Sequence, residues 1–227
     1  MAPLTGAGGS GSGSAGRRSL ILAGIAAPIV NWGLSAVVIA GWPGYDPVAQ
    51  SISLLANAPL GWLQAVAFGV GGLLGVGWAL GLSSVLGATP RDQALVRGML
   101  LLQAVITIAF AIFPTDPDGV PMSAIGQIHL ANFYLYSVAM PLTLLVLGLV
   151  MRRDPGWRGS ARPTLFAAGL VVLTTALVPA TIEGPLTPWL GLLERLYVAI
   201  PSVWQVGAGL VAWRLARPTS AGRPAGS

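Results

Sequence analysis

The sequence contains no cysteine, no lysine and a single histidine, and only 8% of its 227 residues are charged. Without cysteine the chain cannot form disulfides, use a thiolate for catalysis or bind an iron–sulfur cluster. Without lysine it cannot form a Schiff base, and one histidine is too few for a bis-histidine haem. The use of arginine throughout in place of lysine is typical of GC-rich genomes, so we expect a bacterial protein.

Apolar residues make up 54% of the chain, well above the share in soluble domains. Six uncharged stretches are each long enough for about 20 residues of helix, which is what a hydrocarbon layer of roughly 30 Å requires. They predict membrane helices at residues 20–40, 59–86, 90–113, 123–151, 162–181 and 188–215. The predicted fold class is therefore all-α, a polytopic transmembrane bundle of six helices.

The predicted transmembrane domain covers residues 19–217, between a disordered Gly/Ser-rich tail (1–18) and a second disordered tail (218–227). Two arginines before the first apolar stretch resemble a signal peptide, but the stretch exceeds the typical h-region of about 7 to 15 residues. We therefore interpret it as a membrane helix. Thr89-Pro90 and Thr187-Pro188 each place a hydroxyl at the N-cap and proline at the first helical position, which predicts two helix starts.

The arginines orient the predicted bundle. All of the 12 except Arg195 lie near the termini or in the second and fourth connections, which share one side of the membrane. Because arginine is enriched in cytoplasmic loops, we expect both termini to be cytoplasmic in a multi-pass protein of the bacterial plasma membrane. The net charge of +5 then reflects topology and gives no reason to expect nucleic-acid binding. Most acidic residues accompany Arg195 on the other side.

Small and neutral polar residues within the predicted helices indicate helix packing. Gly71 with Gly75, and Gly77 with Gly81, have the GxxxG spacing that lets helix backbones approach closely, and we expect them to pack inside the bundle. A dimer face is the alternative role for these glycines, so a homo-oligomer is possible, although no residue indicates one. Neutral polar residues near mid-membrane are expected to form interhelical hydrogen bonds, and a ligand-lining role for one or two is the alternative. They are Asn31, Gln64, Gln103, Thr174 and Gln205.

Two titratable residues lie deeper than the acidic loops on the side opposite the arginines. His129 and Glu194 are each about two turns into a predicted helix, roughly 9 to 10 Å below the surface at 1.5 Å per residue. Asn132 and Tyr136 share a helix face with His129, and Tyr197 shares one with Glu194. The matching depth predicts a polar pocket between these two helices.

The predicted pocket suits acid–base chemistry, with Glu194 as proton donor and His129 as its partner, the two candidate catalytic residues. Candidate substrate-binding residues surround them: Arg195, Asn132, Asp46, Asp116, Tyr136 and Tyr197. His129 with carboxylates could also bind a divalent metal, but no metal-ligand motif lies within one helix, so no metal or other cofactor is predicted.

A purely structural interpretation remains open for the same residues. Arg195 would then pair with Glu183 or Asp116 and lock the fifth and sixth helices together, while His129 bonds a loop carbonyl. Ionisable groups buried in a membrane favour a functional role, so neither interpretation is excluded.

Several short motifs occur near the side opposite the arginines. They are Asp46-Pro47, Ser51-Ile-Ser-Leu54, Phe113-Pro-Thr-Asp116, His129, and Gly191-Leu-Leu-Glu194-Arg195. With these motifs, residues 19–217 resemble the bacterial membrane proteins grouped as domain of unknown function 998 (DUF998). The resemblance implies a six-helix bundle whose characteristic residues cluster on the outer side. It implies no settled activity.

We therefore expect an integral membrane protein that binds or processes a hydrophobic or lipid-like molecule entering from the outer leaflet. Its expected partners are membrane lipids and a hydrophobic small molecule. The alternative is a non-catalytic structural or assembly protein, or a small transporter. The residues do not decide whether the protein is an enzyme, although proton-initiated rearrangement or hydrolysis of a lipid fits them better than redox chemistry.

Overall fold

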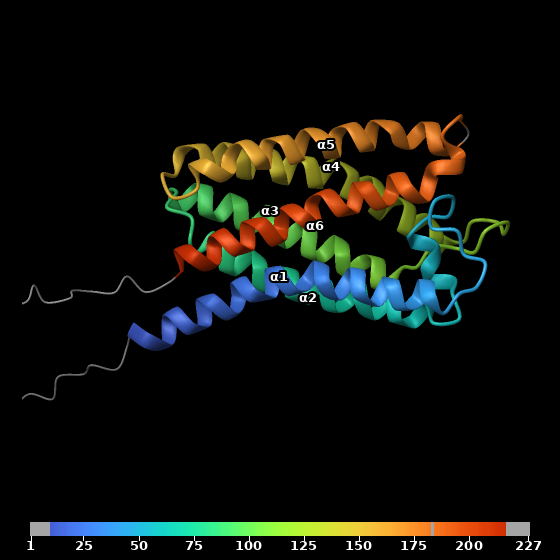
Figure 1. Cartoon of the computed structure of the whole chain (residues 1–227), viewed down its shortest axis with the longest axis horizontal. Coiled ribbons are helices and arrows are strands. Elements are labelled where there is room, and N and C mark those ends of the chain that lie inside the picture. Colours follow the sequence, from blue (N-terminus) through green and yellow to red (C-terminus); the bar gives the residue numbers. More distant parts are fainter. Residues whose placement is uncertain (1–9, 183, 217–227) are drawn as a thin grey trace, which may run out of the picture.

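The computed structural model describes residues 10–182 and 184–216, which form six long helices joined by short connections (Figure 1). The long helices are α1 (Ser10–Ala40), α2 (Gly61–Ser83), α3 (Pro90–Ile112), α4 (Ala124–Arg153), α5 (Arg158–Ile182) and α6 (Leu190–Leu215). Two 3-10 helices, η1 (Ser53–Asn57) and η2 (Thr187–Trp189), lie in the connections. All six long helices are long and apolar enough to cross a membrane, which confirms the all-α class and a multi-pass membrane protein.

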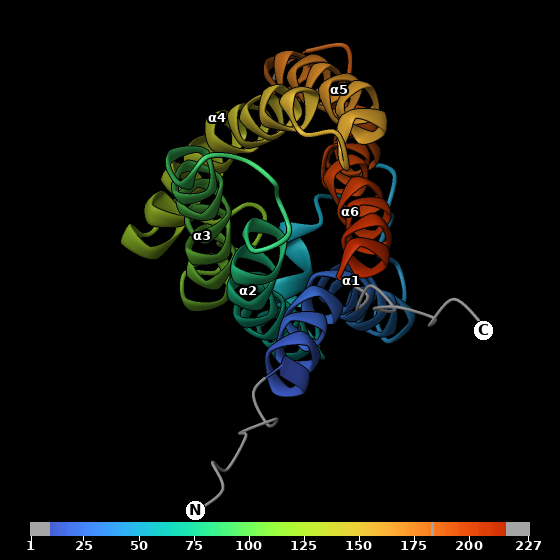
Figure 2. The same ribbon diagram turned by 90° about the vertical axis from the view of Figure 1, so that its left-hand side faces the viewer.

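The six helices form a closed ring in sequence order (Figure 2). Each helix packs against the next one along the chain, and α6 returns to pack against α1. A hydrogen bond supports this closure. Pro28 has no N–H for the carbonyl of Gly24, four residues earlier in α1, and Gln205 of α6 donates its Nε2–H to that carbonyl at 2.8 Å. The ring is therefore closed between its last helix and its first.

The two ends of the ring carry different charges. One end holds the helix termini next to residues 10 and 216 and the α2–α3 and α4–α5 connections, and we call it the arginine-rich end (Figure 1). The other end holds the α1–α2, α3–α4 and α5–α6 connections with Asp46, Asp116 and Asp118, and we call it the acidic end. Glu194 and Arg195 lie in the first turns of α6 at this acidic end. The predicted separation of arginines from acids thus coincides with the two ends of the ring.

One of the two predicted helix starts is confirmed and the other is wrong. Pro90 begins α3, and Thr89 Oγ1 accepts the N–H of Asp92 at 3.2 Å. The start predicted at Pro188 fails because Thr187 and Pro188 form η2, and α6 begins only at Leu190. The hydroxyl of Thr187 donates to the carbonyl of Gly184 at 2.8 Å, so it does not cap a helix.

The first helix begins at Ser10, earlier than predicted, so residues 10–18 extend α1 where the sequence predicted a tail. These residues include Arg17 and Arg18, and they contain no proline that would end the helix. Hydropathy alone cannot find such a start, because the helix continues beyond its apolar part. The rest of the two predicted tails lies outside the described residues.

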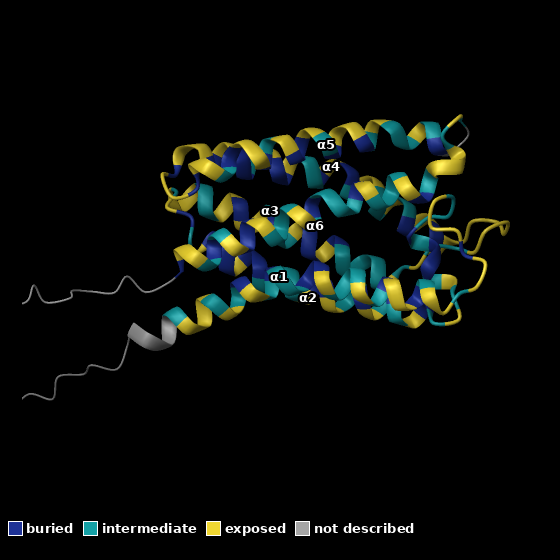
Figure 3. Cartoon of the chain, viewed as in Figure 1, coloured by how far each residue is buried: buried dark blue, intermediate teal, exposed yellow. Residues whose placement is uncertain are grey.

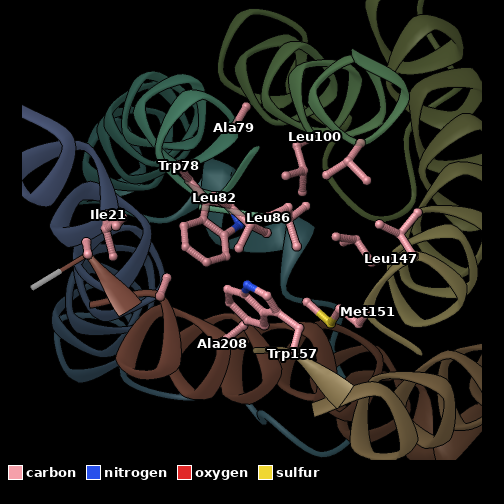
Figure 4. Close-up of a cluster of buried hydrophobic side chains, with 14 of the residues drawn as sticks. Ile21, Trp78, Ala79, Leu82, Leu86, Leu100, Leu147, Met151, Trp157 and Ala208 are labelled. Atoms are coloured by element: carbon pink, nitrogen blue, oxygen red, sulfur yellow. The ribbon is translucent and has the colours of Figure 1, made fainter. Parts of the chain in front are cut away.

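The ring interior at the arginine-rich end is filled by apolar side chains (Figure 4). Trp157, Leu82, Leu147 and Met151 are completely buried there, while the outward faces of the helices are largely exposed (Figure 3). Close helix contacts at glycine contribute: a Cβ at Gly81 would lie 2.9 Å from the backbone nitrogen of Ile21 in α1. A Cβ at Gly77 would likewise lie 3.0 Å from the Cβ of Ala23, so the expected packing inside the bundle is confirmed for this pair, whereas a Cβ at Gly71 would have no neighbour closer than 3.8 Å.

Candidate functional site

The centre of the ring contains a cavity of about 160 Å³. Its wall is formed by α1, α2, α3, α4, α6 and η1. Aromatic side chains form much of the wall: Phe68, Trp78, Phe110, Phe133, Tyr136, Tyr197 and Trp204. Polar side chains occur at several depths: Asn31, Ser53, Gln103, Thr107, Thr143, Glu194, Ser202 and Gln205. Because a cavity of about 150 Å³ holds a benzene molecule, this one has room for a ring-sized group.

The α1–α2 connection lies at the acidic end of the ring (Figure 1), where it covers the cavity. Ile52 and Ser53 from this connection line the cavity directly. Ile52, Leu54 and Leu55 are buried, and they pack in one apolar cluster with Val38 and Tyr45. The connection is therefore a packed part of the fold, and the side chains that hold it also close one end of the cavity.

Glu194 fastens this cover to α6. Its Oε2 accepts the backbone N–H of Ile52 at 2.6 Å, and its Oε1 accepts the hydroxyl of Ser53 at 3.2 Å. Charge-assisted bonds of this kind are about twice as strong as bonds between neutral groups. Because Glu194 also lines the cavity, its carboxylate joins the cover to the cavity wall.

Arg195 binds the same connection through its carbonyl groups. Its Nη1 donates to the carbonyls of Pro47 (2.7 Å) and Gln50 (3.0 Å), and its Nη2 donates to the hydroxyl of Tyr45 (2.5 Å). The sequence suggested that Arg195 locks the fifth and sixth helices together, but these contacts attach α6 to the α1–α2 connection. Of the two acids proposed as its partner, Asp116 binds Ser123 instead, and Glu183 lies outside the described residues.

Gly191 makes this attachment sterically feasible. A Cβ at this position would overlap the carbonyl oxygens of Gln50 and Pro47, which are backbone atoms and cannot move aside easily. One residue further along, the N–H of Leu192 donates to the carbonyl of Val48 at 2.9 Å. The first turn of α6 therefore lies directly against the α1–α2 connection.

Tyr45 completes the attachment from the other side. Its hydroxyl donates to the carbonyl of Ser51 at 2.7 Å while it accepts from Arg195. Burial raises the pKa of the Tyr45 phenol above its ordinary value, although the hydrogen bond and charge of Arg195 oppose this effect. The phenol consequently keeps its proton at neutral pH and can make both bonds.

His129 is buried in α4, but it forms a different set of contacts. Its Nδ1 lies 2.8 Å from the carbonyl oxygen of Phe113, at the end of α3, and its ring lies 5.1 Å from the ring of Phe110. Asn132 donates to the carbonyl of Ile106 at 3.0 Å. Both side chains join α4 to α3, and the cavity lining formed by the described residues includes Glu194 but not His129.

The helices α4 and α6 do meet inside the ring, one to two turns away from His129 and Glu194. The rings of Tyr136 and Tyr197 pack edge to face with centroids 5.4 Å apart. Both tyrosines line the cavity. The structure therefore brings Glu194, Tyr136 and Tyr197 to one cavity, and leaves His129 and Asn132 at the α3–α4 contact.

The two loop aspartates bind their own connections. Asp46 Oδ1 accepts the N–H of Val48 at 2.8 Å, and Asp116 accepts both the N–H and the hydroxyl of Ser123 at 2.7 Å. Within residues 10–182 and 184–216, no three His, Asp or Glu side chains are close enough to hold a metal ion. The alternative of a metal bound by His129, Asp46, Asp116 and Glu194 is therefore not supported by the geometry.

Three of the five mid-membrane polar residues form the expected interhelical hydrogen bonds, which confirms that prediction for Gln64, Gln103 and Gln205. Gln64 bonds Ser35 (2.9 Å), and Gln103 bonds Thr143 (3.0 Å). Thr174 bonds carbonyls of its own helix. Sequence reasoning missed five aromatic residues of the cavity wall (Phe68, Trp78, Phe110, Phe133 and Trp204) and four hydroxyl-bearing ones (Ser53, Thr107, Thr143 and Ser202). The available signal was the position of Trp78 and Trp204 within helices instead of at their ends, near a membrane surface.

Comparison with known protein families gives one match. Residues 25–211 match the model of the family described as "Protein of unknown function (DUF998)", which confirms the resemblance seen in the sequence. Neither the curated proteins nor the solved structures gave a match. The family description states no activity, so an argument about function depends on the geometry of the cavity.

Proposed function

We propose that this chain, which belongs to the DUF998 family of membrane proteins, binds a hydrophobic or lipid-like molecule in its central cavity. The observation that carries the proposal is the aromatic wall of that cavity, closed at the acidic end by a connection that Glu194 and Arg195 hold in place. Ligand pockets are typically concave and mostly apolar, with a few placed polar groups.

An empty cavity of this size would be expensive. At about 24 cal/mol per Å³, the 160 Å³ cavity would cost about 4 kcal/mol in lost contacts. Helix association in membranes depends on van der Waals packing, so a bundle gains nothing from leaving its centre unfilled. A bound apolar molecule would restore those contacts, which is the physical reason for proposing an occupant.

Trp204 offers a route between this cavity and the bilayer. It lines the central cavity and also a groove between α5 and α6 that includes Pro163, Leu196 and Val203, which are exposed side chains. Its Nε1 donates to Thr164 Oγ1 of α5 at 2.9 Å. We propose that the ligand enters from the lipid by passing this indole, and no aqueous route is needed.

The arginines support an orientation for this binding protein. We propose that the arginine-rich end is cytoplasmic and that Glu194 faces the extracytoplasmic side of a bacterial plasma membrane, because arginine is enriched in cytoplasmic loops. The chain has no cysteine, so single cysteines can be labelled without background. A membrane-impermeant maleimide should label Val120→Cys from outside intact cells and Gly159→Cys only after lysis. The reverse pattern would overturn the orientation.

Acid–base catalysis is not included in the proposal. The two residues proposed for it from the sequence, Glu194 and His129, make separate sets of contacts, and both Glu194 oxygens bind the α1–α2 connection. Ion-coupled transport has little support for a related reason. Apart from Glu194 at the acidic end, the polar residues that line the cavity in the described chain are neutral, so they provide no charge near mid-membrane to relay a proton or bind an ion.

The test is to purify the full chain into lipid nanodiscs and identify molecules that are retained, by organic extraction and mass spectrometry. We expect one hydrophobic compound to be enriched over the nanodisc lipid. Glu194→Gln should reduce its recovery several-fold because the amide weakens the cover of the cavity.

Asp154→Asn is the matched control, because Asp154 is also a carboxylate that binds the backbone N–H of a distant connection but does not line the cavity. Its recovery per folded molecule should equal that of the parent. Circular dichroism and gel filtration would establish the folded fraction of each variant. Recovery of nothing above nanodisc lipid from the parent would overturn the proposed function.

A further inference from the structure

We propose that the ligand of the central cavity carries an uncharged group that both donates and accepts hydrogen bonds, such as a hydroxyl or an amide, bound between Gln103, Asn31 and Trp78. The inference rests on the proposed function, since it assigns a chemical class to the occupant of that cavity. The three residues come from α3, α1 and α2, and all three line the cavity.

Gln103 supplies a free acceptor. The side chain is 8% exposed, and its Nε2 donates to Thr143 Oγ1 at 3.0 Å. The Thr143 hydroxyl gives its only proton to the carbonyl of Ala139 at 2.7 Å, so Gln103 must present its amide N–H to that hydroxyl. The Oε1 of Gln103 is then the free atom, and it has no hydrogen-bond partner in the described chain.

Trp78 supplies a free donor. Its side chain is 2% exposed, and its Nε1 has no hydrogen-bond partner among the described residues. The indole lies inside the ring, where Figure 4 shows it as part of the packed cluster of the arginine-rich end. An N–H is a donor only, so an occupant near Trp78 must offer an acceptor to satisfy it.

Asn31 adds a third polar group from α1, because its buried Oδ1 lacks a partner in the described residues. No bond of this amide to the described residues sets which end faces the cavity, so it can accept or, turned by 180°, donate. A buried polar group without a partner costs about 1 to 3 kcal/mol, which makes three of them beside one cavity unusual for a packed bundle. The acceptor of Gln103 and the donor of Trp78 match a hydroxyl, which gives one proton and accepts another, and Asn31 can provide a further bond to an amide. An anionic headgroup would have no proton to give to Gln103.

The size of the cavity limits the part of the molecule that is bound. About 160 Å³ accommodates a ring-sized or similarly short apolar portion together with its polar group. A longer hydrocarbon tail would have to leave the cavity, and Trp204 is the wall residue that borders the α5–α6 groove. The inferred class is therefore a neutral, hydroxyl- or amide-bearing lipid or lipid-like alcohol, whose polar end lies inside the ring.

The experiment uses the full chain in phosphatidylcholine nanodiscs with three probes that have the same ring: cyclohexanol, cyclohexane and cyclohexylammonium. The shift of the thermal unfolding midpoint is titrated against the concentration of each probe in the bilayer. A net hydrogen bond of about 1.4 kcal/mol corresponds to tenfold in affinity, so cyclohexanol should bind about tenfold more tightly than cyclohexane. Cyclohexylammonium should bind more weakly than cyclohexanol.

Gln103→Met should remove the preference for cyclohexanol, because methionine has a similar shape and no amide. Gln64→Met is the matched control: Gln64 is an equally buried amide with an unpartnered Nε2, but it does not line the cavity. The control should keep the tenfold preference. If Gln103→Met does not fold, Trp78→Phe removes the donor instead and should reduce the preference in the same direction.

The outcomes separate the two proposals. Equal affinity of parent protein for cyclohexanol and cyclohexane would overturn the inference and leave the proposed function intact. Tighter binding of cyclohexylammonium would also overturn it, in favour of a cationic ligand held by aromatic rings and Glu194. If none of the three probes shifts the midpoint, both the inference and the proposed function are contradicted. That result would mean that the cavity holds water and binds no apolar ligand.

Discussion

Asp154, which is buried, and Glu194, which is half-buried, are carboxylates at opposite ends of the ring, and they make similar bonds. Asp154 Oδ2 accepts the N–H of Gly87 at 2.6 Å, which ties the end of α4 to the α2–α3 connection. Glu194 Oε2 accepts the N–H of Ile52 at 2.6 Å, which ties α6 to the α1–α2 connection. Both use charge-assisted bonds to hold a connection that is distant in sequence.

The two sites differ in what lies behind the carboxylate. Next to Asp154, Trp157 is completely buried and donates its Nε1–H to the carbonyl of Val85 at 3.1 Å, and apolar side chains fill the ring. Next to Glu194 lies the cavity with its aromatic wall. A buried charge at the end of a membrane bundle therefore does not identify a site by itself, and the unfilled space beside it separates a binding function from a structural one.

The largest expected effect comes from replacing one tryptophan in the filled part of the ring, Trp157, and comparing it with one at the cavity, Trp204. Trp157→Ala should lower the free energy of unfolding by about 4 kcal/mol, because a fully buried indole leaves a new cavity and an unpaired carbonyl. Trp204→Ala should cost about half of that, since its side chain already borders open space on two sides. Chemical unfolding in mixed micelles measures both.

The contrast has a second readout. Trp204→Ala should merge the central cavity with the α5–α6 groove and speed the exchange of a bound probe, whereas Trp157→Ala should leave the exchange rate of folded protein unchanged. Equal destabilisation by both variants would mean that the centre of the ring is as well packed as the arginine-rich end.

The next effect concerns the contact between α6 and the α1–α2 connection. Gly191→Ala should destabilise the protein by about 2 kcal/mol, because the added methyl group overlaps backbone carbonyls that Arg195 binds. Gly207→Ala, in the same helix, is the control: no atom lies within 4 Å of its added Cβ. It should be neutral or stabilising by up to about 1 kcal/mol from helix propensity.

The thermal unfolding midpoint in detergent distinguishes these two glycine variants. A Gly191→Ala protein as stable as Gly207→Ala would show that the connection can move away from α6 at little cost. The cover would then be a weak lid, and Glu194 would not restrict access to the cavity.

A smaller effect is expected for the phenol that joins Arg195 to the same connection. Tyr45→Phe removes a bond donated to the carbonyl of Ser51 and one accepted from Arg195, and it should cost about 1 kcal/mol. Tyr134→Phe removes the hydroxyl of an exposed ring and should change the unfolding midpoint little. An equal effect of the two variants would argue against a role for Tyr45 in holding the cover.

The helices were predictable from the sequence because each depends on a local property, an uncharged stretch of sufficient length. Pro90 was found for the same reason, since its role depends only on its neighbours. The start of α6 was not, because a proline after threonine is compatible with both an α-helix and the 3-10 turn that forms at Thr187–Trp189.

The positions of the candidate site residues along their helices were predictable from the sequence, but the directions in which their side chains point were not. The similar depth of His129 and Glu194 followed from counting helix turns, whereas their directions around the helix axes depend on how six helices close into a ring. That packing turns His129 towards Phe113 and brings Tyr136 to Tyr197 instead. The aromatic wall of the cavity had only a weak sequence signal, the position of Trp78 and Trp204 within helices, since an aromatic residue that lines a void and one that fills a core look the same.

The smallest expected effect tests the cavity with a single methyl group. Gly71 and Gly69 lie on the same helix, and a Cβ at either position would have its nearest neighbour at 3.8 Å, an ordinary contact. Only Gly71 lines the cavity, so Gly71→Ala should lower ligand recovery or probe affinity two- to threefold, while Gly69→Ala should not. Both should gain similar helix propensity, of up to about 1 kcal/mol, so their unfolding midpoints should match. Because stability is held equal in this pair, a difference in binding can come only from the space beside Asn31, and the absence of a difference would remove that space from the site.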